Sequence, residues 1–372
     1  MKIKIVDAMM GKGKTSWAIN FMNERTEFGY VYITPFLDEV DRVMSSVEYP
    51  TYTPKVHMND DGNVVFKKEA FNKLLIGKKS IVSTHSLFAS VNDTDKDLIT
   101  AGNYVLILDE VMSVVDTINI SASDLKLLIN QKAILFSDDN EQVIWNDEFK
   151  DYRGKFTYIK DIAKDGRLIH LNGNLLYWKF PVDVFKAFNE VIILTYKFRS
   201  QIQHYYYQLH NIEFDYYSVD NIGGKYKLID YVDEGGAELR DLINIVDDEK
   251  LNSIGNREGN LSSNWFNTAS DDVVKSLKNN VMNYYMNREP KVSSKYKLWT
   301  TFNDFRKSIT GKGYSRGFLQ HLARATNEYQ HKTKLAYVLN KYMLVPISQY
   351  FGHHDIKVDQ DDYALSEMLQ WI

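Results

Sequence analysis

The chain has 372 residues, of which 44% are hydrophobic and 25% are charged, a composition typical of a globular protein with two or three domains. It contains no cysteine, which excludes disulfides, thiolate metal sites and cysteine nucleophiles. The formal net charge of −4 argues against a protein coated in positive charge, although a local basic groove is compatible with it. No uncharged apolar run approaches about 18 residues, so we expect no interaction with a membrane.

The first predicted element is a strand over residues 3–6. It continues into the stretch Ala8-Met9-Met10-Gly11-Lys12-Gly13-Lys14-Thr15 and a helix over residues 16–22. These residues do not form a signal peptide, so we expect a cytoplasmic protein. A turn rich in glycine and lysine between strand and helix is the arrangement of a phosphate-binding loop, although Ala8 replaces the usual first glycine. The alternative, a surface loop of the same composition, is disfavoured by the strand-to-helix position.

Each residue type in this loop has a role in binding a nucleotide. The glycines let backbone N–H groups close around phosphate oxygens, and the N-terminus of the new helix adds its positive end. Lys14 would reach the β- and γ-phosphates, and the Thr15 hydroxyl would ligate Mg²⁺. The residues expected to bind the nucleotide cofactor are Gly11, Lys12, Gly13, Lys14, Thr15 and Ser16.

Strands and helices alternate over the first half of the chain, which predicts an α/β fold with a parallel sheet. Residues 131–175 interrupt the alternation, because they are irregular and charged, and we expect a small hairpin insertion there. The predicted strands comprise residues 30–34, 80–83, 104–108 and 190–195.

Asp109 and Glu110 follow the most apolar of these strands, so we expect two carboxylates at its carboxyl end. Hydrolysis of a nucleoside triphosphate needs one acid to hold Mg²⁺ and a second acid to activate the attacking water. Asp109 suits the metal side and Glu110 the general base, with Lys14 as the third catalytic residue. A solvated acidic turn is the alternative, but the phosphate loop earlier in the chain favours an NTP hydrolase.

The pattern changes near residue 200, where we place a boundary between domains of residues 1–199 and 200–372. The cluster Tyr205-Tyr206-Tyr207 has the rings to stack bases, although such a cluster more often packs in a core. The main elements predicted for the second half are a tyrosine-rich helix, two strands, a long helix and another strand, over residues 201–210, 214–219, 225–232, 270–286 and 297–301.

A basic stretch interleaved with aromatic residues is a candidate path for a nucleic-acid backbone. A solvated helix face over an aromatic core would give the same pattern, and the sequence does not separate the two interpretations. The basic residues of this stretch are Lys295, Lys297, Arg306, Lys307, Lys312 and Arg316.

The phosphate loop, the Asp109-Glu110 pair and the order of the remaining segments resemble superfamily 2 helicases, specifically the DEAD/DEAH-like helicases encoded by phages and prophages. The resemblance implies two RecA-like P-loop NTPase domains with parallel central sheets and an ATP site in the cleft between the domains. It also implies ATP hydrolysis with Mg²⁺ as the metal cofactor. Met112 departs from the pattern, because DEAD and DEAH proteins have Asp or His at this place.

Further segments resemble later helicase motifs. Leu194-Thr195-Tyr196 occupies the place of the Ser/Thr-Ala-Thr turn that couples hydrolysis to domain movement, and Gln370 lies in the last motif. The resemblance therefore implies coupling roles for Thr195 and Gln370. The residues for which it implies contacts with nucleic acid are Thr34, Pro35, Ser83, Thr84, His85, Thr300, Thr326 and Asn327.

The last motif of these helicases normally continues into arginines that reach the γ-phosphate, and an arginine of this kind accelerates related NTPases by orders of magnitude. In this sequence only Trp371-Ile372 follows Gln370. We expect a truncated second domain, an arginine supplied from elsewhere, or slow turnover. Arg316 and Arg324 are the nearest candidates, although both are more typical of surface or nucleic-acid-facing residues.

These features predict an ATP-dependent helicase or translocase of phage DNA replication or recombination, in the cytoplasm of a host cell. The expected partners are single-stranded or forked DNA, with RNA as the alternative, and replication proteins. A second hypothesis is a nucleotide-dependent nucleic-acid-binding or loader module of the same fold with weak catalysis. A P-loop kinase is disfavoured because the chain is long for one. A packaging ATPase is disfavoured because residues 200–372 contain no cluster of carboxylates for a nuclease.

Overall fold

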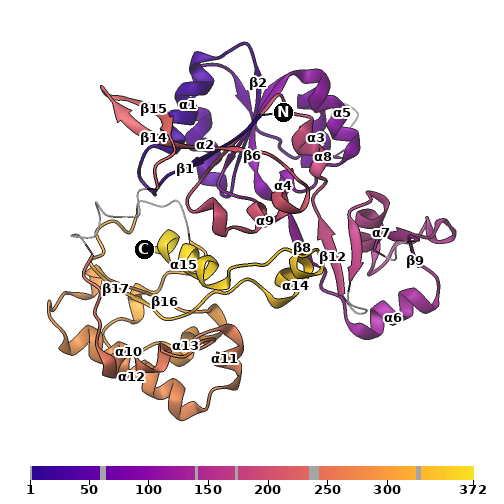
Figure 1. The fold of residues 1–372 in the computed structure, drawn as a ribbon. Coiled ribbons are helices and arrows are strands. Elements are labelled where there is room, and N and C mark those ends of the chain that lie inside the picture. The colour runs from indigo at the N-terminus through magenta and orange to yellow at the C-terminus, as the bar shows by residue number, and fades with distance from the viewer. Residues whose placement is uncertain (1, 59–63, 139–140, 172–174, 234–242, 324–327) are drawn as a thin grey trace. The chain divides into compact units, whose positions relative to one another are not determined.

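A computed structural model of the chain describes residues 2–58, 64–138, 141–171, 175–233, 243–323 and 328–372 (Figure 1). Its contacts divide the chain into two compact units. The first unit comprises Met1–Asp233 with Leu344–Val358, and the second comprises Glu234–Met343 with Asp359–Ile372. Each unit is thus built from two separate stretches of the chain.

The first unit is built on an eight-stranded sheet in which every neighbouring pair except β14 and β15 is parallel. The predicted α/β fold with a parallel central sheet is therefore confirmed. The carboxyl ends of the parallel strands lie at one edge of the sheet. The residues that follow β1 and β7 therefore lie at this edge. In spatial order the strands are β15 (Lys225–Asp230), β14 (Asp215–Ile222), β1 (Lys2–Asp7), β13 (Glu190–Thr195), β7 (Tyr104–Asp109), β2 (Gly29–Thr34), β6 (Ser80–Thr84) and β3 (Thr51–Tyr52).

Helices cover both faces of this sheet, with α1 and α2 on one side and α3, α5 and α8 on the other (Figure 1). The inner strands are continuous apolar runs because both of their faces are buried. Trp17 and Met22 of α1, for example, pack in one cluster with Tyr32 and Ile107 of the sheet. The helices of the first unit outside residues 115–179 are α1 (Lys14–Glu24), α2 (Leu37–Ser46), α3 (Lys67–Ile76), α4 (His85–Phe88), α5 (Asp93–Gly102), α8 (Val182–Lys186), α9 (Ile202–Leu209) and α14 (Val345–His353). A separate short hairpin is formed by β4 (His57–Met58) and β5 (Val64–Val65).

The two units do not divide at the boundary that the sequence pattern suggested near residue 200. β14 pairs with β1 in parallel, with Ile5 opposite Tyr216, so the strands after α9 extend the first sheet. β14 is followed by the antiparallel strand β15, and this hairpin ends the regular alternation of strands and helices. The change of pattern in the sequence therefore coincides with the last strands of the first unit.

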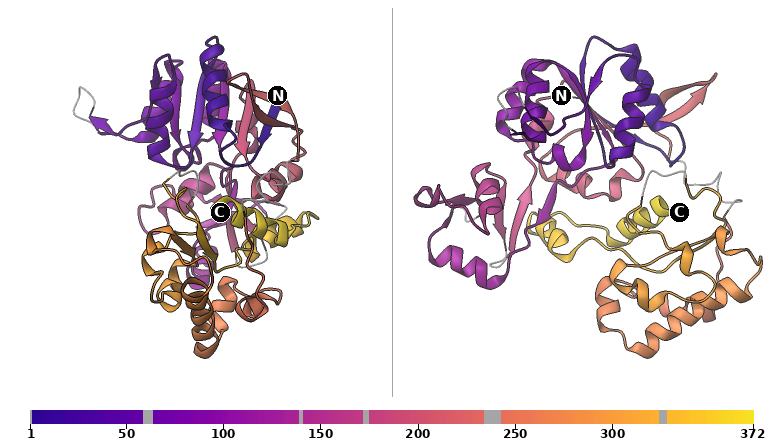
Figure 2. Two further views of the ribbon diagram at one scale, coloured as in Figure 1. Left: turned by 90° about the vertical axis from the view of Figure 1, so that its left-hand side faces the viewer. Right: turned by 180° about the vertical axis from the view of Figure 1, so that it is seen from behind.

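Residues 115–179, within the connection between β7 and β13, form a lobe of their own beside the sheet, as Figure 2 shows. It is larger than the small hairpin insertion predicted there, and the prediction of mostly irregular structure was wrong. Leu125, Ile134, Trp145, Ile159 and Leu176 belong to a separate hydrophobic core, which makes the lobe compact. Its elements are β8 (Val115–Thr117), α6 (Ala122–Asn130), β9 (Ile134–Phe136), β10 (Val143–Trp145), α7 (Thr157–Lys164), β11 (Leu168–Leu171) and β12 (Leu175–Lys179).

The second unit has its own aromatic core around a parallel pair of strands, β16 and β17. Trp299 of β16 is fully buried and packs with Tyr285, Tyr314 and Phe266. Among the residues that the structure describes, no helix in either unit is long and apolar enough to cross a membrane. The elements of this unit are α10 (Glu249–Asn252), α11 (Ser263–Thr268), α12 (Asp271–Asn287), β16 (Lys297–Thr300), α13 (Arg306–Ile309), β17 (Lys334–Tyr337) and α15 (Gln360–Trp371).

Candidate active site

The glycine-rich loop between β1 and α1 turns through two glycines with positive φ angles. Gly11 and Gly13 have φ angles of +78° and +87°, in the left-handed region that glycine adopts without a steric penalty. Gly13 is the residue that precedes α1, so the helix begins at Lys14, close to the predicted position. The loop therefore brings backbone N–H groups and a helix N-terminus to one place.

Lys14 is buried at the first position of α1 and extends back across the loop. Its Nζ donates hydrogen bonds to the carbonyl oxygens of Ala8, at 2.6 Å, and Met9, at 3.0 Å. The ammonium group thus lies within the curve of the loop, in the position from which a lysine contacts a bound phosphate chain.

Thr15 and Asp109 come together from different elements, and both were predicted to hold Mg²⁺. The Thr15 hydroxyl donates to Oδ2 of Asp109 at 3.0 Å, and the buried Tyr32 hydroxyl donates to the same oxygen at 2.7 Å. Desolvation raises the pKa of Asp109, and these two hydrogen bonds partly offset the rise. A hydroxyl and a carboxylate are oxygen ligands of the kind that Mg²⁺ prefers, so the donor set fits this ion.

Glu110 lies at the end of β7 in a conformation that is unusual for any residue except glycine. Its φ angle is +78°, its N–H donates to the carbonyl oxygen of Leu194 at 2.8 Å, and its Oε2 accepts a hydrogen bond from Thr195 Oγ1 at 3.2 Å. A backbone held in this sparsely populated region costs free energy and is maintained by its surroundings, as often occurs at active sites. The contacts join the predicted base to the predicted coupling residue.

Asp7 connects the phosphate loop to the turn after β13, a role that the sequence analysis missed. Its two carboxylate oxygens accept hydrogen bonds from the backbone N–H groups of Lys197, at 2.8 Å, and Phe198, at 2.9 Å. The N–H of Ala8 donates to the carbonyl oxygen of Thr195 at 3.1 Å. Burial raises the pKa of Asp7, and the two amides together with the charge of Lys14 oppose the rise.

Two strand ends bring the predicted nucleic-acid contacts of the first unit together. In the register of β2 and β6, Thr34 lies opposite Thr84 and Ile33 opposite Ser83. Thr34 and Ser83 are buried, whereas Pro35, Thr84 and His85 are partly exposed. Among the described residues, Thr34 Oγ1 has no hydrogen-bond partner although it is buried. These residues lie at the same edge of the sheet as the phosphate loop, and their contacts with nucleic acid stay a prediction.

The predicted site residues of the second unit have different environments. Thr300, at the end of β16, is fully buried, and Gln370 is largely buried in α15. Thr326 and Asn327 lie outside the described residues, as does Arg324. Lys297 of the basic stretch is buried and donates to the carbonyl oxygen of Gly313 at 3.0 Å, so this lysine supports the fold of the unit.

The tyrosine cluster Tyr205-Tyr206-Tyr207 is buried in the first unit, which confirms the packing interpretation. The nearby Gln203 accepts a hydrogen bond from the N–H of Met112 at 3.0 Å and donates one to the hydroxyl of Tyr207 at 3.0 Å. Met112, which departs from the DEAD/DEAH pattern, is therefore a buried residue next to the acid pair.

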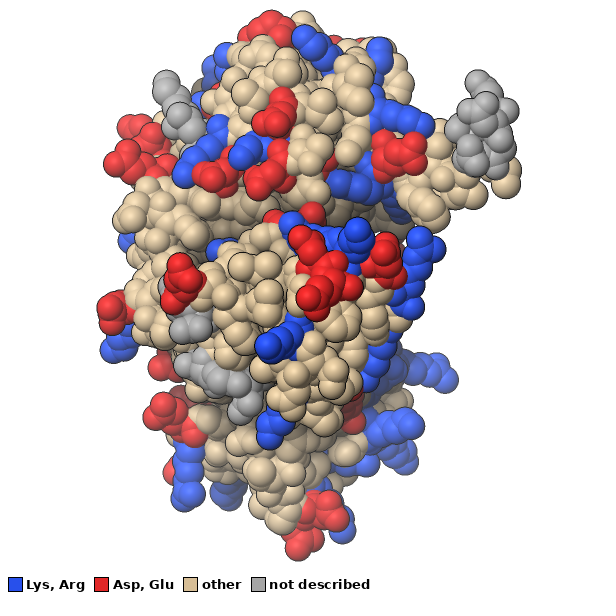
Figure 3. Space-filling view, turned by 90° about the vertical axis from the view of Figure 1, so that its right-hand side faces the viewer, with Lys and Arg blue, Asp and Glu red and all other residues tan. Residues whose placement is uncertain are grey.

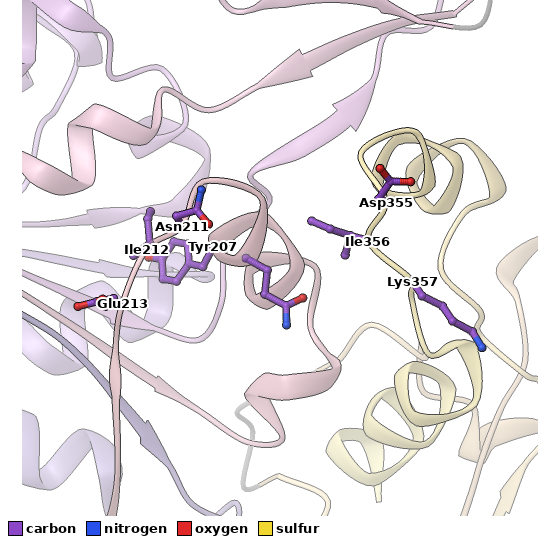
Figure 4. A pocket seen from close by; sticks show the side chains of 8 residues that line it. Tyr207, Asn211, Ile212, Glu213, Asp355, Ile356 and Lys357 are labelled. Atoms are coloured by element: carbon purple, nitrogen blue, oxygen red, sulfur yellow. The ribbon is translucent and has the colours of Figure 1, made fainter.

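Two pockets of the first unit lie away from this site. An open pocket of about 620 Å³ lies between the end of α9 and the segment after α14 (Figure 4). Another, of about 500 Å³, is lined by residues at the amino ends of β2 and β6, whereas ligands of open α/β sheets bind at the carboxyl ends. The pocket in Figure 4 is lined by Tyr207, Gln208, Asn211, Ile212, Glu213, Asp355, Ile356 and Lys357.

Comparison with protein families identifies two parts of the chain. Residues 115–178 match the YonV middle domain, and residues 237–372 match the YonV C-terminal Rossmann-like domain. The chain is also 42% identical over 382 residues to the SPbeta prophage-derived uncharacterized protein YonV of Bacillus subtilis (strain 168), covering 100% of this chain and 92% of that protein. The chain belongs to the YonV family. The YonV middle domain corresponds to the lobe between β7 and β13.

Two solved structures are similar to this YonV-family chain. One, named XPD_APO, matches with a TM-score of 0.50 and 11% sequence identity, over 100% of this chain and 89% of that chain. Another, named XPD_Helicase, has a TM-score of 0.45 and 11% identity, over 99% of this chain and 89% of that chain. At this level of identity the first match shows the fold alone, and with the Rossmann-like C-terminal domain it supports the predicted pair of RecA-like domains.

We expect Asp7→Asn to lower the free energy of unfolding by about 1–3 kcal/mol, because the new NH₂ group would face a backbone N–H in a buried site. Wild-type Asp7 binds its proton more tightly when folded, so the wild-type protein loses stability as pH rises from the usual aspartate range through the raised pKa. Asn does not titrate, so the stability difference between the two proteins should decrease as pH rises. Denaturant unfolding at several pH values measures this difference.

Asp161→Asn, an exposed aspartate on α7, is the matched control for this change and should leave the unfolding free energy nearly unchanged at every pH. Equal stabilities of the wild-type protein and Asp7→Asn across the pH range would contradict the structural role of Asp7.

Proposed function

We propose that this YonV-family chain is an ATP-dependent helicase or translocase of superfamily 2 that hydrolyses ATP with Mg²⁺ and moves on nucleic acid. The observation that supports it most is the convergence of Lys14, Thr15, Asp109 and Glu110, from two separate strand ends, at one edge of the sheet. Each of the four has the chemistry that its role in triphosphate hydrolysis requires.

The proposed chemistry divides among these residues. The loop N–H groups and Lys14 would bind the β- and γ-phosphates, and Thr15 and Asp109 would hold Mg²⁺, which would neutralise phosphate charge. Glu110 accepts a proton from the attacking water, and the hydroxyl of Thr195 orients the Glu110 carboxylate. Tyr32 and Asp7 position these groups without contacting the substrate.

Movement on nucleic acid is supported by the motif order and by the XPD-like fold. Thr34, Thr84 and His85 lie at the carboxyl edge of the same sheet as the proposed hydrolysis site. Only a few strands separate them from that site, so a conformational change at the site could extend to them. Figure 3 shows basic and acidic side chains intermixed on the face drawn, so binding would use a local path rather than a uniformly basic surface. Single-stranded or forked DNA is the proposed partner, with RNA as the alternative.

The proposed setting is phage DNA replication or recombination in the host cytoplasm, together with replication proteins. It is supported by the prophage origin of the Bacillus subtilis relative. The DEAD/DEAH-like assignment within superfamily 2 is supported by the phosphate loop and the Asp109-Glu110 pair.

Lys14→Ala should reduce ATP hydrolysis by roughly 100-fold or more, because it removes the cation that binds and stabilises the phosphate chain. Its thermal unfolding should stay cooperative, since the rest of the loop is unchanged. Steady-state phosphate release measures the effect. The control is Lys73→Ala, an exposed lysine on α3. Wild-type turnover in Lys14→Ala would contradict the proposed site.

Glu110→Gln should retain ATP binding but lower kcat by roughly 10²–10⁴-fold, because the amide cannot accept the proton of the attacking water. Equilibrium ATP binding and single-turnover hydrolysis measure the two effects separately. Glu148→Gln, an exposed residue of the β7–β13 lobe, serves as the matched control. Weak binding combined with normal turnover would show that Glu110 is not the base.

Single-stranded DNA should increase the ATP hydrolysis rate several-fold, and the increase should fall as salt concentration rises, because binding to the phosphate backbone releases counterions. Hydrolysis is measured with and without a single-stranded oligonucleotide, a blunt duplex and a single-stranded RNA. A chain that binds ATP but shows no stimulation by any nucleic acid would contradict a translocase. ATP-dependent DNA binding with negligible turnover would instead support the binding or loader module.

A further inference from the structure

The β14–β15 hairpin extends the first sheet beyond β1 and packs against α1 (Figure 1). Its antiparallel register pairs Val219 with Leu228 and Asn221 with Tyr226, which places these four side chains on one face of the hairpin. Val219 is buried in the cluster that contains helix α1, and Leu228 and Tyr226 pack against that cluster. The face that carries Tyr226 is therefore directed toward α1.

The ring of Tyr226 lies directly against the phosphate loop. A Cβ atom placed on Gly13 would be 2.1 Å from Cε1 of Tyr226 and 2.6 Å from its Cζ, closer than any side chain can approach. Gly13 therefore has two reasons to be glycine, its positive φ angle and the aromatic ring beside it. The contact makes Tyr226 an aromatic side chain adjoining the proposed phosphate site, although it is more than two hundred residues away in the sequence.

The strand order indicates which end of a nucleotide this ring would meet. β1 lies between β14 on one side and β13, followed by β7, on the other. The phosphate that is transferred must lie near Glu110, at the end of β7, and Thr15 is already joined to Asp109 on that side. A triphosphate bound with its terminal phosphate there extends away from β7, so its nucleoside points toward the side of β1 that the hairpin occupies.

We infer that Tyr226 forms part of the binding surface for the nucleoside of the bound triphosphate, with its ring stacking against the base. This inference rests on the proposed nucleotide-binding function and extends it from the phosphates to the base. Stacking on an aromatic ring is tolerant of base identity, because every base has a π face. Asn221, opposite Tyr226, accepts a hydrogen bond from the N–H of Gly224 at 2.9 Å, so its side-chain oxygen supports the hairpin turn. Because stacking does not select the base, purine triphosphates should bind with similar affinities.

The test compares a ligand that has a base with one that lacks it. Equilibrium titration of the full chain with ADP and with inorganic pyrophosphate, both with Mg²⁺, separates the nucleoside contribution from the phosphate contribution. Tyr226→Ala should weaken ADP binding by roughly tenfold, a value within the range expected for the loss of one base–aromatic stack. It should leave pyrophosphate binding nearly unchanged. Tyr226→Phe, which keeps the ring, should bind both ligands like the wild type.

Two further variants distinguish the loss of stacking from a change in the conformation of the phosphate loop. Tyr226→Leu keeps apolar packing against Gly13 and α1 but lacks a π face, so it should lose ADP affinity like Tyr226→Ala. Ile222→Ala alters an exposed residue on the opposite face of the hairpin and should change neither ligand's affinity.

Equal weakening of ADP and pyrophosphate in Tyr226→Leu and Tyr226→Ala would overturn the inference, because Tyr226 would then only shape the loop. Unchanged ADP affinity in both variants would also overturn it. In both cases the proposed function would still be supported if the wild-type chain bound pyrophosphate and Lys14→Ala weakened that binding. If the wild-type chain bound neither ligand, the proposed function would fail and the inference would fail with it.

Discussion

The arrangement of the candidate site depends on the register of three parallel strands. β1 and β13 pair so that Asp7 lies opposite Thr195, and β13 and β7 pair so that Leu194 lies opposite Asp109. This register fixes the level at which each strand ends, and the phosphate loop, the turn after β13 and the acid pair all begin at that level. A shift of the register by one residue would turn the side chains of the shifted strand to the other face of the sheet. The site is therefore as well defined as the hydrogen-bond ladder that supports it.

The carboxylates of Asp7 and Asp109 are desolvated at this edge, and the hydrogen bonds that stabilise them link the parts of the site. A carboxylate removed from water is unstable unless donors reach it, and desolvation raises the pKa of both Asp7 and Asp109. Backbone amides of the turn after β13 supply the donors for Asp7, and the hydroxyls of Tyr32 and Thr15 supply those for Asp109. The same hydrogen bonds that make burial tolerable connect β1 with β13 and β2 with β7. These hydrogen bonds therefore connect the phosphate loop with the neighbouring strand ends.

The parts that the sequence made predictable are those encoded by contiguous residues. A glycine-rich turn between strand and helix, and an apolar strand ending in Asp109-Glu110, are local patterns whose chemistry follows from their order. Tyr32, Asp7 and Tyr226 were missed because their roles arise from contacts between distant segments. A tyrosine within a buried strand and an aspartate just before the loop were visible, but either is compatible with ordinary packing. The β14–β15 hairpin was predicted as strands, yet only its pairing with β1 assigns it to the first sheet.

The position of that hairpin indicates on which side of β1 the nucleoside would lie, which the motifs alone do not indicate. A phosphate loop binds phosphates from above a helix N-terminus, and nothing in its sequence states on which side the nucleoside lies. With the acids on one side of β1 and an aromatic ring against Gly13 on the other, the two ends of a nucleotide bound as proposed would be distinguished. Because β14 pairs with β1 and the hairpin packs on α1, the base-binding surface would be part of the rigid sheet rather than a mobile segment. Placing Tyr226 there would order the ring before the nucleotide binds, and this would lower the conformational entropy lost on binding.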